Sequence, residues 1–320
     1  MKKSKILITG FSGFVSRHFL HFLYENNIVC DVLGTDVRMP TFNYTSFEDK
    51  INIKFKCVDL LNEEEIRKTF LQFVPDYILH LASFSSVAFS WKYPTESFAN
   101  NTNIFCNLVT VAKEFNKDCR ILSVGSSEEY GNVTEEDLPL KETHILKPVS
   151  PYAVARVAQE MLSQVFADSY KLNIILTRSF NHIGPWQDER FVIPSFINKI
   201  IRIKKSNRSE GIIETGNIEI VRDFLDVRDV VRAYYLLLTR GNSGEVYNVC
   251  SGEGILLKDA IQIIADLLAV KVTTRINPEF VRPGDNKVII GTYEKIGKEL
   301  GWEPEIKFEK TLSDMIKNMW

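Results

Sequence analysis

The sequence predicts an α/β protein with a doubly wound parallel sheet and a smaller C-terminal α/β lobe. Short apolar runs alternate with helical segments from residue 5 to residue 124, as in the β–α units of a parallel sheet. Glycines follow the first apolar run, and an acidic residue follows the second. The 320 residues suffice for a Rossmann-type sheet of roughly six or seven strands and a second lobe.

The first β–α unit contains a turn suited to a pyrophosphate. The apolar run 6–8 predicts a buried strand, and the apolar spacing over 14–23 predicts a helix. Between them, Gly10 permits a tight turn and Gly13 lets the backbone approach a phosphate, whose charge a helix N-terminus favours. Ser16 stands where a third glycine would allow close packing of the helix on the strand. An ordinary strand-to-helix turn is the alternative interpretation.

The second strand ends at an acidic residue. An apolar run over 29–35 leads to Asp36, about 20 residues beyond the glycines, where an acid can bond both hydroxyls of a ribose. Asp36 favours NAD, because its charge would repel the 2′-phosphate of NADP. Arg38 could offset that repulsion and leaves NADP open. The alternative interpretation of Asp36 is a turn residue at the end of a strand.

The alternation continues through three more strands and two helices. We expect strands over 53–58, 77–81 and 120–124, and helices over 63–73 and about 94–115. Asp59 and the segment 81–83 then fall at the carboxyl ends of strands, where ligands bind in this architecture, although such residues also simply end strands. His80 lies inside an apolar strand, so we interpret it as a core residue.

The next strand end carries candidate acid–base chemistry. Ser126 and Glu128 follow the predicted strand 120–124, on the side of the sheet where we expect ligands to bind. Tyr152 and Arg156 are four residues apart in a predicted helix and therefore share one face. The guanidinium can stabilise the phenolate and hold a ribose, while Ser126 shares the substrate oxygen. A surface Tyr/Arg pair would give the same spacing, and Glu128 would serve equally as a loop carboxylate.

Composition excludes several classes of function. The formal net charge of −2 indicates neither a nucleic-acid nor a membrane partner. The five cysteines are scattered, as expected for reduced core residues of a cytoplasmic protein and not for a disulfide framework or a metal site. No apolar stretch approaches the ~20 residues of a membrane span.

Three motifs lead to a family resemblance. They are Thr-Gly-x-x-Gly-Phe at 9–14, Ser-Pro-Tyr-x-x-x-Lys at 150–156, with arginine in place of the lysine, and Arg-x-Phe-Asn-x-x-Gly-Pro at 178–185. The chain resembles the extended short-chain dehydrogenase/reductase family of nucleotide-sugar enzymes over essentially its whole length. Within it, strings such as Gly-Ser-Ser-Glu-Glu-Tyr-Gly at 125–131 are most similar to those of GDP-4-keto-6-deoxy-D-mannose reductases.

The resemblance implies two lobes and a set of residue roles. Residues 1–180, with contributions from about 217–250, would bind NAD(P), and residues 181–320 would mainly bind the nucleotide sugar. Ser126 and Tyr152 would handle the proton at the sugar C4 oxygen, with Arg156 in place of the ribose-binding lysine. The predicted cofactor residues are Gly10, Ser12, Gly13, Phe14, Asp36, Arg38, Asp59, Leu60, Leu81, Ala82, Ser83, Tyr152 and Arg156. The predicted substrate residues are Ser126, Asn181, Val192, Lys199, Arg222 and Arg282.

The implied function is hydride transfer between NAD(P) and C4 of a GDP-linked manno-type sugar, within GDP-mannose metabolism and polysaccharide biosynthesis. Two alternatives stay open. One is an NAD-retaining 4-dehydrogenase, epimerase or 4,6-dehydratase acting on a GDP-hexose or GDP-heptose, and in the dehydratases a glutamate at the place of Glu128 removes the C5 proton. The other is a non-catalytic NAD or nucleotide-sugar sensor. The family also implies a homodimer or a higher homo-oligomer. Aromatic and apolar residues over 100–112 and 153–166 would form its helix-bundle contact, and burial within the monomer is an equal alternative.

Overall fold

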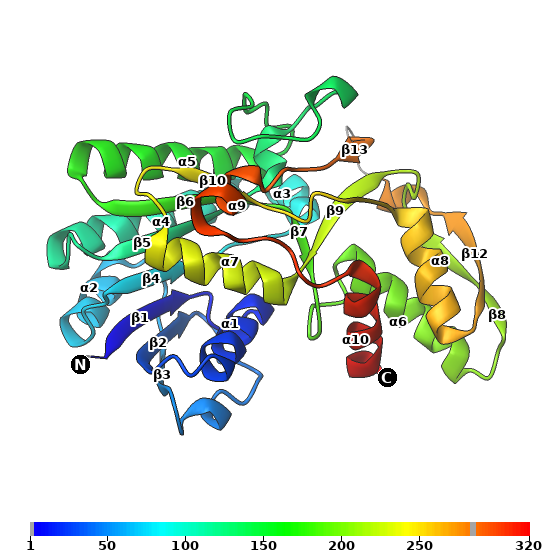
Figure 1. The fold of residues 1–320 in the computed structure, drawn as a ribbon, viewed down its shortest axis with the longest axis horizontal. Coiled ribbons are helices and arrows are strands. Elements are labelled where there is room, and N and C mark those ends of the chain that lie inside the picture. The colour runs from blue at the N-terminus through cyan, green and yellow to red at the C-terminus, as the bar shows by residue number, and fades with distance from the viewer. Residues whose placement is uncertain (1–2, 282–285) are drawn as a thin grey trace.

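The computed structural model describes residues 3–281 and 286–320, and within them seven strands form one parallel sheet (Figure 1). The strand order is β10-β6-β5-β4-β1-β2-β3. The strands are β1 (Ser4–Thr9), β2 (Cys30–Asp36), β3 (Asn52–Cys57), β4 (Tyr77–His80), β5 (Arg120–Ser126), β6 (Asn173–Ser179) and β10 (Val246–Val249). The predicted Rossmann-type fold is confirmed.

Helices cover both faces of this sheet and bury its apolar side chains. One face packs against α1 (Phe14–Glu25), α7 (Val227–Arg240) and α9 (Glu294–Leu300). The opposite face packs against α2 (Glu63–Gln72), α4 (Pro94–Phe115) and α5 (Pro151–Tyr170). Because both faces are covered, the strands are apolar along most of their length, as the short continuous runs in the sequence indicate.

The order of the strands locates the functional edge. The chain adds β2 and β3 on one side of β1 and then crosses to place β4 on the other side. The loops after β1 and β4 therefore leave the same edge at the point where the winding changes direction. Ligands bind at such switch points in open parallel sheets.

The expected elements agree with the observed ones to within a few residues at each end. The short helix α3 (Val87–Lys92) and the 3₁₀ turns η1 (Thr45–Phe47), η2 (Ser127–Tyr130), η3 (Glu135–Asp137) and η4 (Pro278–Phe280) were not predicted, because they are too short to show a periodicity. Helix α1 forms with Ser16 fully buried, so serine replaces the third glycine without ending the helix.

A second layered unit follows the large sheet. Its strands are β7 (Asn181–Ile183), β9 (Val221–Asp226), β11 (Gly254–Leu256) and β13 (Val288–Ile289), beside a parallel pair of β8 (Glu210–Thr215) and β12 (Lys271–Ile276). Its helices are α6 (Val192–Lys205), α8 (Leu257–Leu268) and α10 (Phe308–Met319), which share one apolar core with β7, β8, β9, β11 and β12 (Figure 1).

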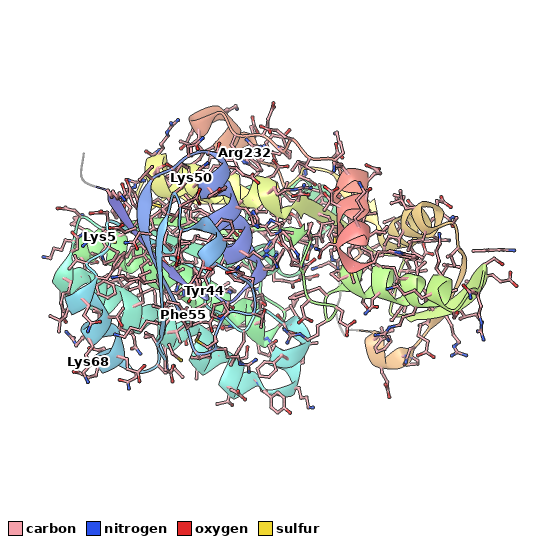
Figure 2. The ribbon with its side chains drawn as sticks, turned by 90° about the horizontal axis from the view of Figure 1, so that it is seen from below. Lys5, Tyr44, Lys50, Phe55, Lys68 and Arg232 are labelled. Atoms are coloured by element: carbon pink, nitrogen blue, oxygen red, sulfur yellow. The ribbon has the colours of Figure 1, made fainter. Side chains whose placement is uncertain are left out.

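An aromatic cluster supports the turn after β1. Phe11 is fully buried, and its ring centroid lies 5.7 Å from those of Phe42 and Tyr44 and 5.9 Å from that of Phe55. Figure 2 shows Tyr44 and Phe55 close together, and their ring centroids lie 6.5 Å apart. Gly34 makes room for this ring, since a Cβ there would lie 2.2 Å from a Phe11 ring atom. The turn is thus anchored by packing as well as by hydrogen bonds.

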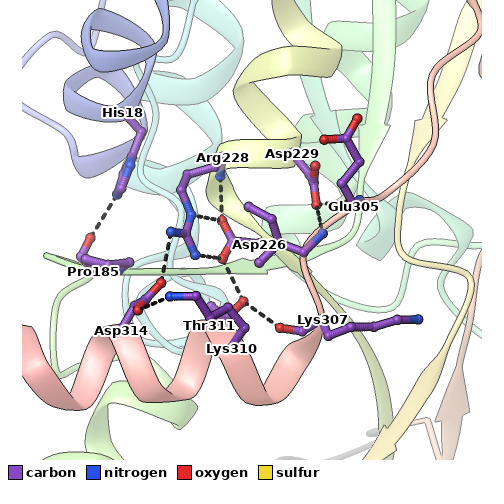
Figure 3. Close-up of polar contacts among 11 residues, drawn as sticks. His18, Pro185, Asp226, Arg228, Asp229, Glu305, Lys307, Lys310, Thr311 and Asp314 are labelled. Atoms are coloured by element: carbon purple, nitrogen blue, oxygen red, sulfur yellow. Dashed lines mark hydrogen bonds and ion pairs between the residues drawn. The ribbon is translucent and has the colours of Figure 1, made fainter. Parts of the chain in front are cut away.

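An ion pair joins the start of α7 to the last helix (Figure 3). The buried carboxylate of Asp226 accepts hydrogen bonds from the Arg228 backbone at 2.8 Å, from its guanidinium at 2.7 and 2.9 Å, and from the Thr311 hydroxyl at 2.6 Å. Arg228 also reaches Asp314 at 2.9 Å. The hydrogen bond to Asp226 raises the pKa of Arg228, so the cation is held in its charged form.

We expect Asp226→Ala to lower the free energy of unfolding by about 3 kcal/mol, because it removes the N-cap of α7 and leaves the Arg228 and Thr311 donors without their acceptor. Thr311→Val should cost only about 1 kcal/mol, since it removes a single hydrogen bond. Urea unfolding followed by circular dichroism measures both. Equal losses for the two variants would contradict the role given to the carboxylate.

Candidate active site

The turn between β1 and α1 is shaped by its glycines. Gly10 has a φ of +67°, which favours glycine, and a Cβ there would lie 2.7 Å from the backbone nitrogen of Ala82. The Gly13 amide donates to the Gly10 carbonyl at 3.0 Å, and α1 begins at the next residue, Phe14. The turn therefore passes against the end of β4 and presents the N-terminus of α1 at the switch point. These features suit a pyrophosphate.

Asp36 is held beside this turn. One carboxylate oxygen accepts the Ser12 amide at 3.0 Å, and the other accepts the Arg38 amide at 3.3 Å. The Ser12 hydroxyl in turn donates to the Arg38 carbonyl at 2.7 Å. The acid is thus oriented before any ligand arrives, and each oxygen keeps a lone pair for a ribose hydroxyl.

The remaining predicted cofactor residues lie at the same edge. Asp59 follows β3 and is exposed, Leu60 beside it is buried, and the segment 81–83 follows β4 and is half-buried. Thr9 ties the ends of β1 and β4 together, because its hydroxyl accepts the amide of Ala82 at 3.2 Å and bonds Nδ1 of His80 at 2.9 Å. Burial lowers the pKa of His80 to about 3, so the expected core histidine is neutral.

Tyr152 and Arg156 lie on one face of α5, as their spacing predicts. Ser150 caps the helix by accepting the Ala153 amide at 3.1 Å. Both side chains are almost completely buried, and Nε of Arg156 donates to the Tyr152 hydroxyl at 3.2 Å. A surface Tyr/Arg pair is excluded by this burial.

Arg156 is fixed by further bonds. One terminal nitrogen donates to the carbonyl of Val124 at 3.1 Å and to Gln159 at 2.6 Å, and the other donates to the Ser83 hydroxyl. With the bond to Tyr152, these contacts use four of the five guanidinium N–H groups. Arg156 is therefore a permanent cation that joins the ends of β4 and β5 to α5, and it cannot pass on a proton.

Ser126 is the last residue of β5 and the N-cap of η2. Its hydroxyl accepts the Glu128 amide at 3.2 Å, and its own amide donates to the Glu129 carboxyl at 2.6 Å. Ser126 and Glu128 are half-buried, whereas Glu129 is fully buried. We did not single out Glu129 in the sequence, although the Ser-x-x-Glu spacing at 126–129 is that of a capping box.

Apart from Ser126, the predicted substrate residues that the structure describes lie in the second unit. Asn181 is exposed at the start of β7, opposite Phe224 of β9. In β9, Arg222 donates to the carbonyls of Val221 at 2.8 Å and Asn286 at 2.9 Å. Arg282 lies outside the described residues. The pairing of β7 with β9 therefore places Asn181 two residues from the position opposite Arg222.

The remaining two predicted residues lie on α6. Val192 is its first residue and is partly exposed. Lys199 donates to the carbonyl of Glu214 at 2.6 Å, and its ammonium lies 5.1 Å from the centroid of the Phe280 ring. Burial lowers the pKa of Lys199.

Asp223, next to Arg222, is a further buried acid that sequence reasoning missed. It accepts the amide and hydroxyl of Ser251 at 2.7 and 2.6 Å and the amides of Gly252 and Gly291 at 3.0 and 3.3 Å. Burial raises its pKa to about 6. These bonds join two segments, at 251–252 and at 291, to β9 next to Arg222.

Other kinds of site find little support in residues 3–281 and 286–320. This part of the chain has no group of three or more His, Cys, Asp or Glu residues that could hold a metal ion, and no helix long and apolar enough to cross a membrane. Cys30, Cys119 and Cys250 are buried, as expected for core residues, but Cys57 is exposed and Cys106 is half-buried.

Known proteins share this architecture. The GDP-6-deoxy-D-mannose reductase of Pseudomonas aeruginosa is 30% identical over 314 residues, which cover 98% of this chain and 96% of that protein. The dTDP-glucose 4,6-dehydratase 1 of Escherichia coli is 28% identical over 98% of this chain and 92% of that protein.

Solved structures agree with these relatives. RMD from Pseudomonas aeruginosa, solved with NADPH, superposes with a TM-score of 0.83 at 28% identity over 99% of both chains. UDP-glucose 4-epimerase from Thermotoga maritima, solved with UDP-glucose, gives a TM-score of 0.86 at 29% identity over 98% of both chains. The family model described as GDP-mannose 4,6 dehydratase matches residues 7–315. The chain therefore belongs to the GDP-mannose 4,6-dehydratase family of extended short-chain dehydrogenases/reductases.

Proposed function

We propose that the protein is an NAD(P)-dependent oxidoreductase that transfers hydride between its cofactor and C4 of a GDP-linked manno-type sugar. Its activity would be most like that of GDP-4-keto-6-deoxy-D-mannose reductase. The observation that carries this proposal is the buried Tyr152–Arg156 bond at the edge that also holds Ser126 and the Gly10 turn. The 30% identity to the Pseudomonas reductase over 98% of the chain supports the choice of substrate.

The side chains act on the proton at the C4 oxygen. When bound, the nicotinamide cofactor supplies or accepts the hydride. In the reductive direction, Tyr152 gives its hydroxyl proton to the C4 oxygen as that carbonyl is reduced, and Ser126 donates a hydrogen bond to the same oxygen. Arg156 stabilises the phenolate that remains, through its Nε hydrogen bond. In the oxidative direction the same groups work in reverse.

We expect Tyr152→Phe to lower kcat with a GDP-4-keto-6-deoxy sugar by about 10²- to 10⁴-fold, with little change in KM, because the variant loses the acid but keeps the ring. Tyr170→Phe, at the exposed end of the same helix, is the matched control and should behave as wild type. Product formation is read by mass spectrometry. Unchanged turnover in Tyr152→Phe would contradict the proposed acid.

The fixed charge of Arg156 favours a second candidate function. A lysine at this place could pass protons between the tyrosine and water, whereas arginine keeps its proton. That difference suits a reaction in which Tyr152 loses and regains one proton within a single cycle, as in an NAD-retaining epimerase or 4,6-dehydratase. Cofactor released from the denatured protein separates the two functions, because stoichiometric NAD(H) would indicate an internal cycle and an empty site would indicate a dissociable co-substrate.

For the cofactor we propose NAD over NADP. The support is the oriented carboxylate of Asp36, which offers two oxygens to ribose hydroxyls and would face a 2′-phosphate with a negative charge. The similar structure of RMD contains NADPH. If this protein also uses NADPH, the exposed Arg38 is the group that would bind the 2′-phosphate.

We expect Asp36→Asn to raise the preference for NADPH over NADH by about tenfold, since one repulsive charge is removed while the amide oxygen can still accept from the Ser12 amide. Arg38→Ala should move the preference in the opposite direction. The ratio of kcat/KM for the two cofactors measures both. If the ratio is the same in Asp36→Asn and wild type, Asp36 does not select the cofactor.

We further propose the residues and units that hold the sugar nucleotide. Residues 1–180, with about 217–250, would form the cofactor lobe, and residues 181–320 would mainly form the substrate lobe. Asn181 would contact the diphosphate, Arg222 and Arg282 the phosphates and ribose, and the α6 residues Val192 and Lys199 the guanine. The pairing of β7 with β9 supports this arrangement, because it places Asn181 opposite Phe224, two residues from Arg222 on the same strand.

A cytoplasmic homodimer completes the proposal. Phe98 of α4 and Val154, Met161 and Val165 of α5 are between 42% and 51% exposed, although the opposite faces of both helices are buried in the sheet. The α5 residues recur at helical spacing, so they form one apolar stripe. Two such stripes would cover each other in the helix-bundle contact that the family implies.

A further inference from the structure

A buried carboxyl group contacts the backbone of Ser126 at the end of β5. Glu129 is fully buried, and its Oε1 accepts the amide of Ser126 at 2.6 Å. Gly125 makes this approach feasible, because a Cβ at that position would lie 2.4 Å from the same oxygen. The carboxyl therefore packs against the backbone of β5 at the point where Ser126 leaves the sheet.

Among residues 3–281 and 286–320, the cation that acts on Glu129 is Arg178, which is already paired. Arg178 of β6 forms a forked ion pair with Glu160 of α5, with distances of 2.7 and 2.9 Å. Both of these side chains are buried, at 5% and 4% exposure. Arg178 also donates to the carbonyl of Glu142 at 3.0 Å and lies 4.9 Å from the centroid of the Tyr130 ring.

The other charged groups nearby do not supply a second positive partner, as far as the described part of the chain extends. The side chain of Glu142 accepts the Asn248 amide at 2.8 Å, and the Tyr130 hydroxyl donates to Asn248 at 2.7 Å. Arg156 points its terminal nitrogens at Val124, Gln159 and Ser83. An ionised Glu129 would therefore be a second buried negative charge beside a single arginine.

Protonation of Glu129 removes this second buried negative charge. Its Oε2 has no hydrogen-bond donor among the described residues when the group is ionised. The protonated acid can instead donate to Glu160 while its other oxygen still accepts from Ser126. Burial and the neighbouring charge of Glu160 raise the pKa of Glu129 well above its usual range, against smaller opposing effects from the Ser126 amide and Arg178.

We propose that Glu129 is a positioning residue that holds Ser126 in place as a neutral carboxylic acid, and that loss of its proton misplaces Ser126 at alkaline pH. This inference rests on the proposed role of Ser126 at the C4 oxygen. Ionisation would place two carboxylates against one arginine, so the Glu129 side chain would turn away from Glu160 and release the Ser126 amide. A shift of the reacting groups by about 1 Å is enough to slow such a step.

The same proton links stability to pH. The pKa of Glu129 is raised in the folded protein, so its contribution to stability is fully present below the ordinary glutamate range. That contribution is lost as pH rises toward the folded pKa. Glutamine at this position can still accept from the Ser126 amide and donate to Glu160, but it cannot ionise. Glu129→Gln should therefore not lose this stability as the pH rises.

The test compares three variants over the pH range of activity. Glu129→Gln should keep kcat within about twofold of wild type near neutral pH and hold it further into the alkaline range. Glu129→Ala should lose about tenfold in kcat with KM nearly unchanged, because the Ser126 amide is left without its acceptor. Glu136→Gln, which removes an exposed carboxylate from the same loop region, is the charge control and should follow wild type at every pH.

Two readouts that need no substrate keep this inference separate from the proposed function. The infrared spectrum should show a protonated carboxyl band near neutral pH in wild type that is absent from Glu129→Gln. Urea unfolding should show wild type losing stability relative to Glu129→Gln as pH rises. If no C4 substrate is turned over by wild type, the proposed function fails, while these two readouts still decide the state of Glu129. The inference is overturned if the band persists in Glu129→Gln, if the two proteins unfold in parallel, or if Glu129→Gln is as impaired as Glu129→Ala.

Discussion

The guanidinium of Arg156 is the interaction on which the site depends. It joins the tyrosine of α5 to the carbonyl of Val124 in β5 and to Ser83 after β4. These elements come from distant parts of the chain and must meet at one edge for a proton and a ribose to be handled together. Lysine has a more flexible side chain and would make fewer hydrogen bonds, so arginine connects these elements more rigidly. Unlike lysine, arginine cannot exchange a proton at this position.

Local sequence patterns were enough to predict the alternating strands and helices of the large parallel sheet. The apolar runs and the glycine turn depend on neighbours within a few residues, and the structure has them where the sequence indicates. The spacing of Tyr152 and Arg156 likewise predicts their shared face. The parallel pair β8 and β12 escaped prediction because its partners are about 60 residues apart and each strand is half exposed, without a clear alternation.

The missed polar residues have a common cause. Glu129 and Asp223 are acids that a sequence places on the surface by default, yet both are fully buried. Glu129 accepts the amide of Ser126 at the end of β5 and has Glu160, 31 residues further along the chain, as a neighbouring charge. Asp223 accepts loop amides and the hydroxyl of Ser251. Most of these contacts form only when distant segments meet in the folded protein. Composition and residue spacing therefore do not predict that the two acids are buried, and the capping-box pattern at Ser126 is the one sequence signal for Glu129.

The aromatic cluster around Phe11 has a consequence for ligand recognition. A glycine turn in isolation is a flexible segment, and each residue that a ligand must order opposes binding by an entropy of about 1–2 kcal/mol. Here the ring between the two glycines is packed into the space left by Gly34 and is touched by Phe42, Tyr44 and Phe55. The conformation of the turn is already restricted in the folded protein. A dinucleotide that binds there does not have to order the turn, so less of its binding free energy is lost as conformational entropy.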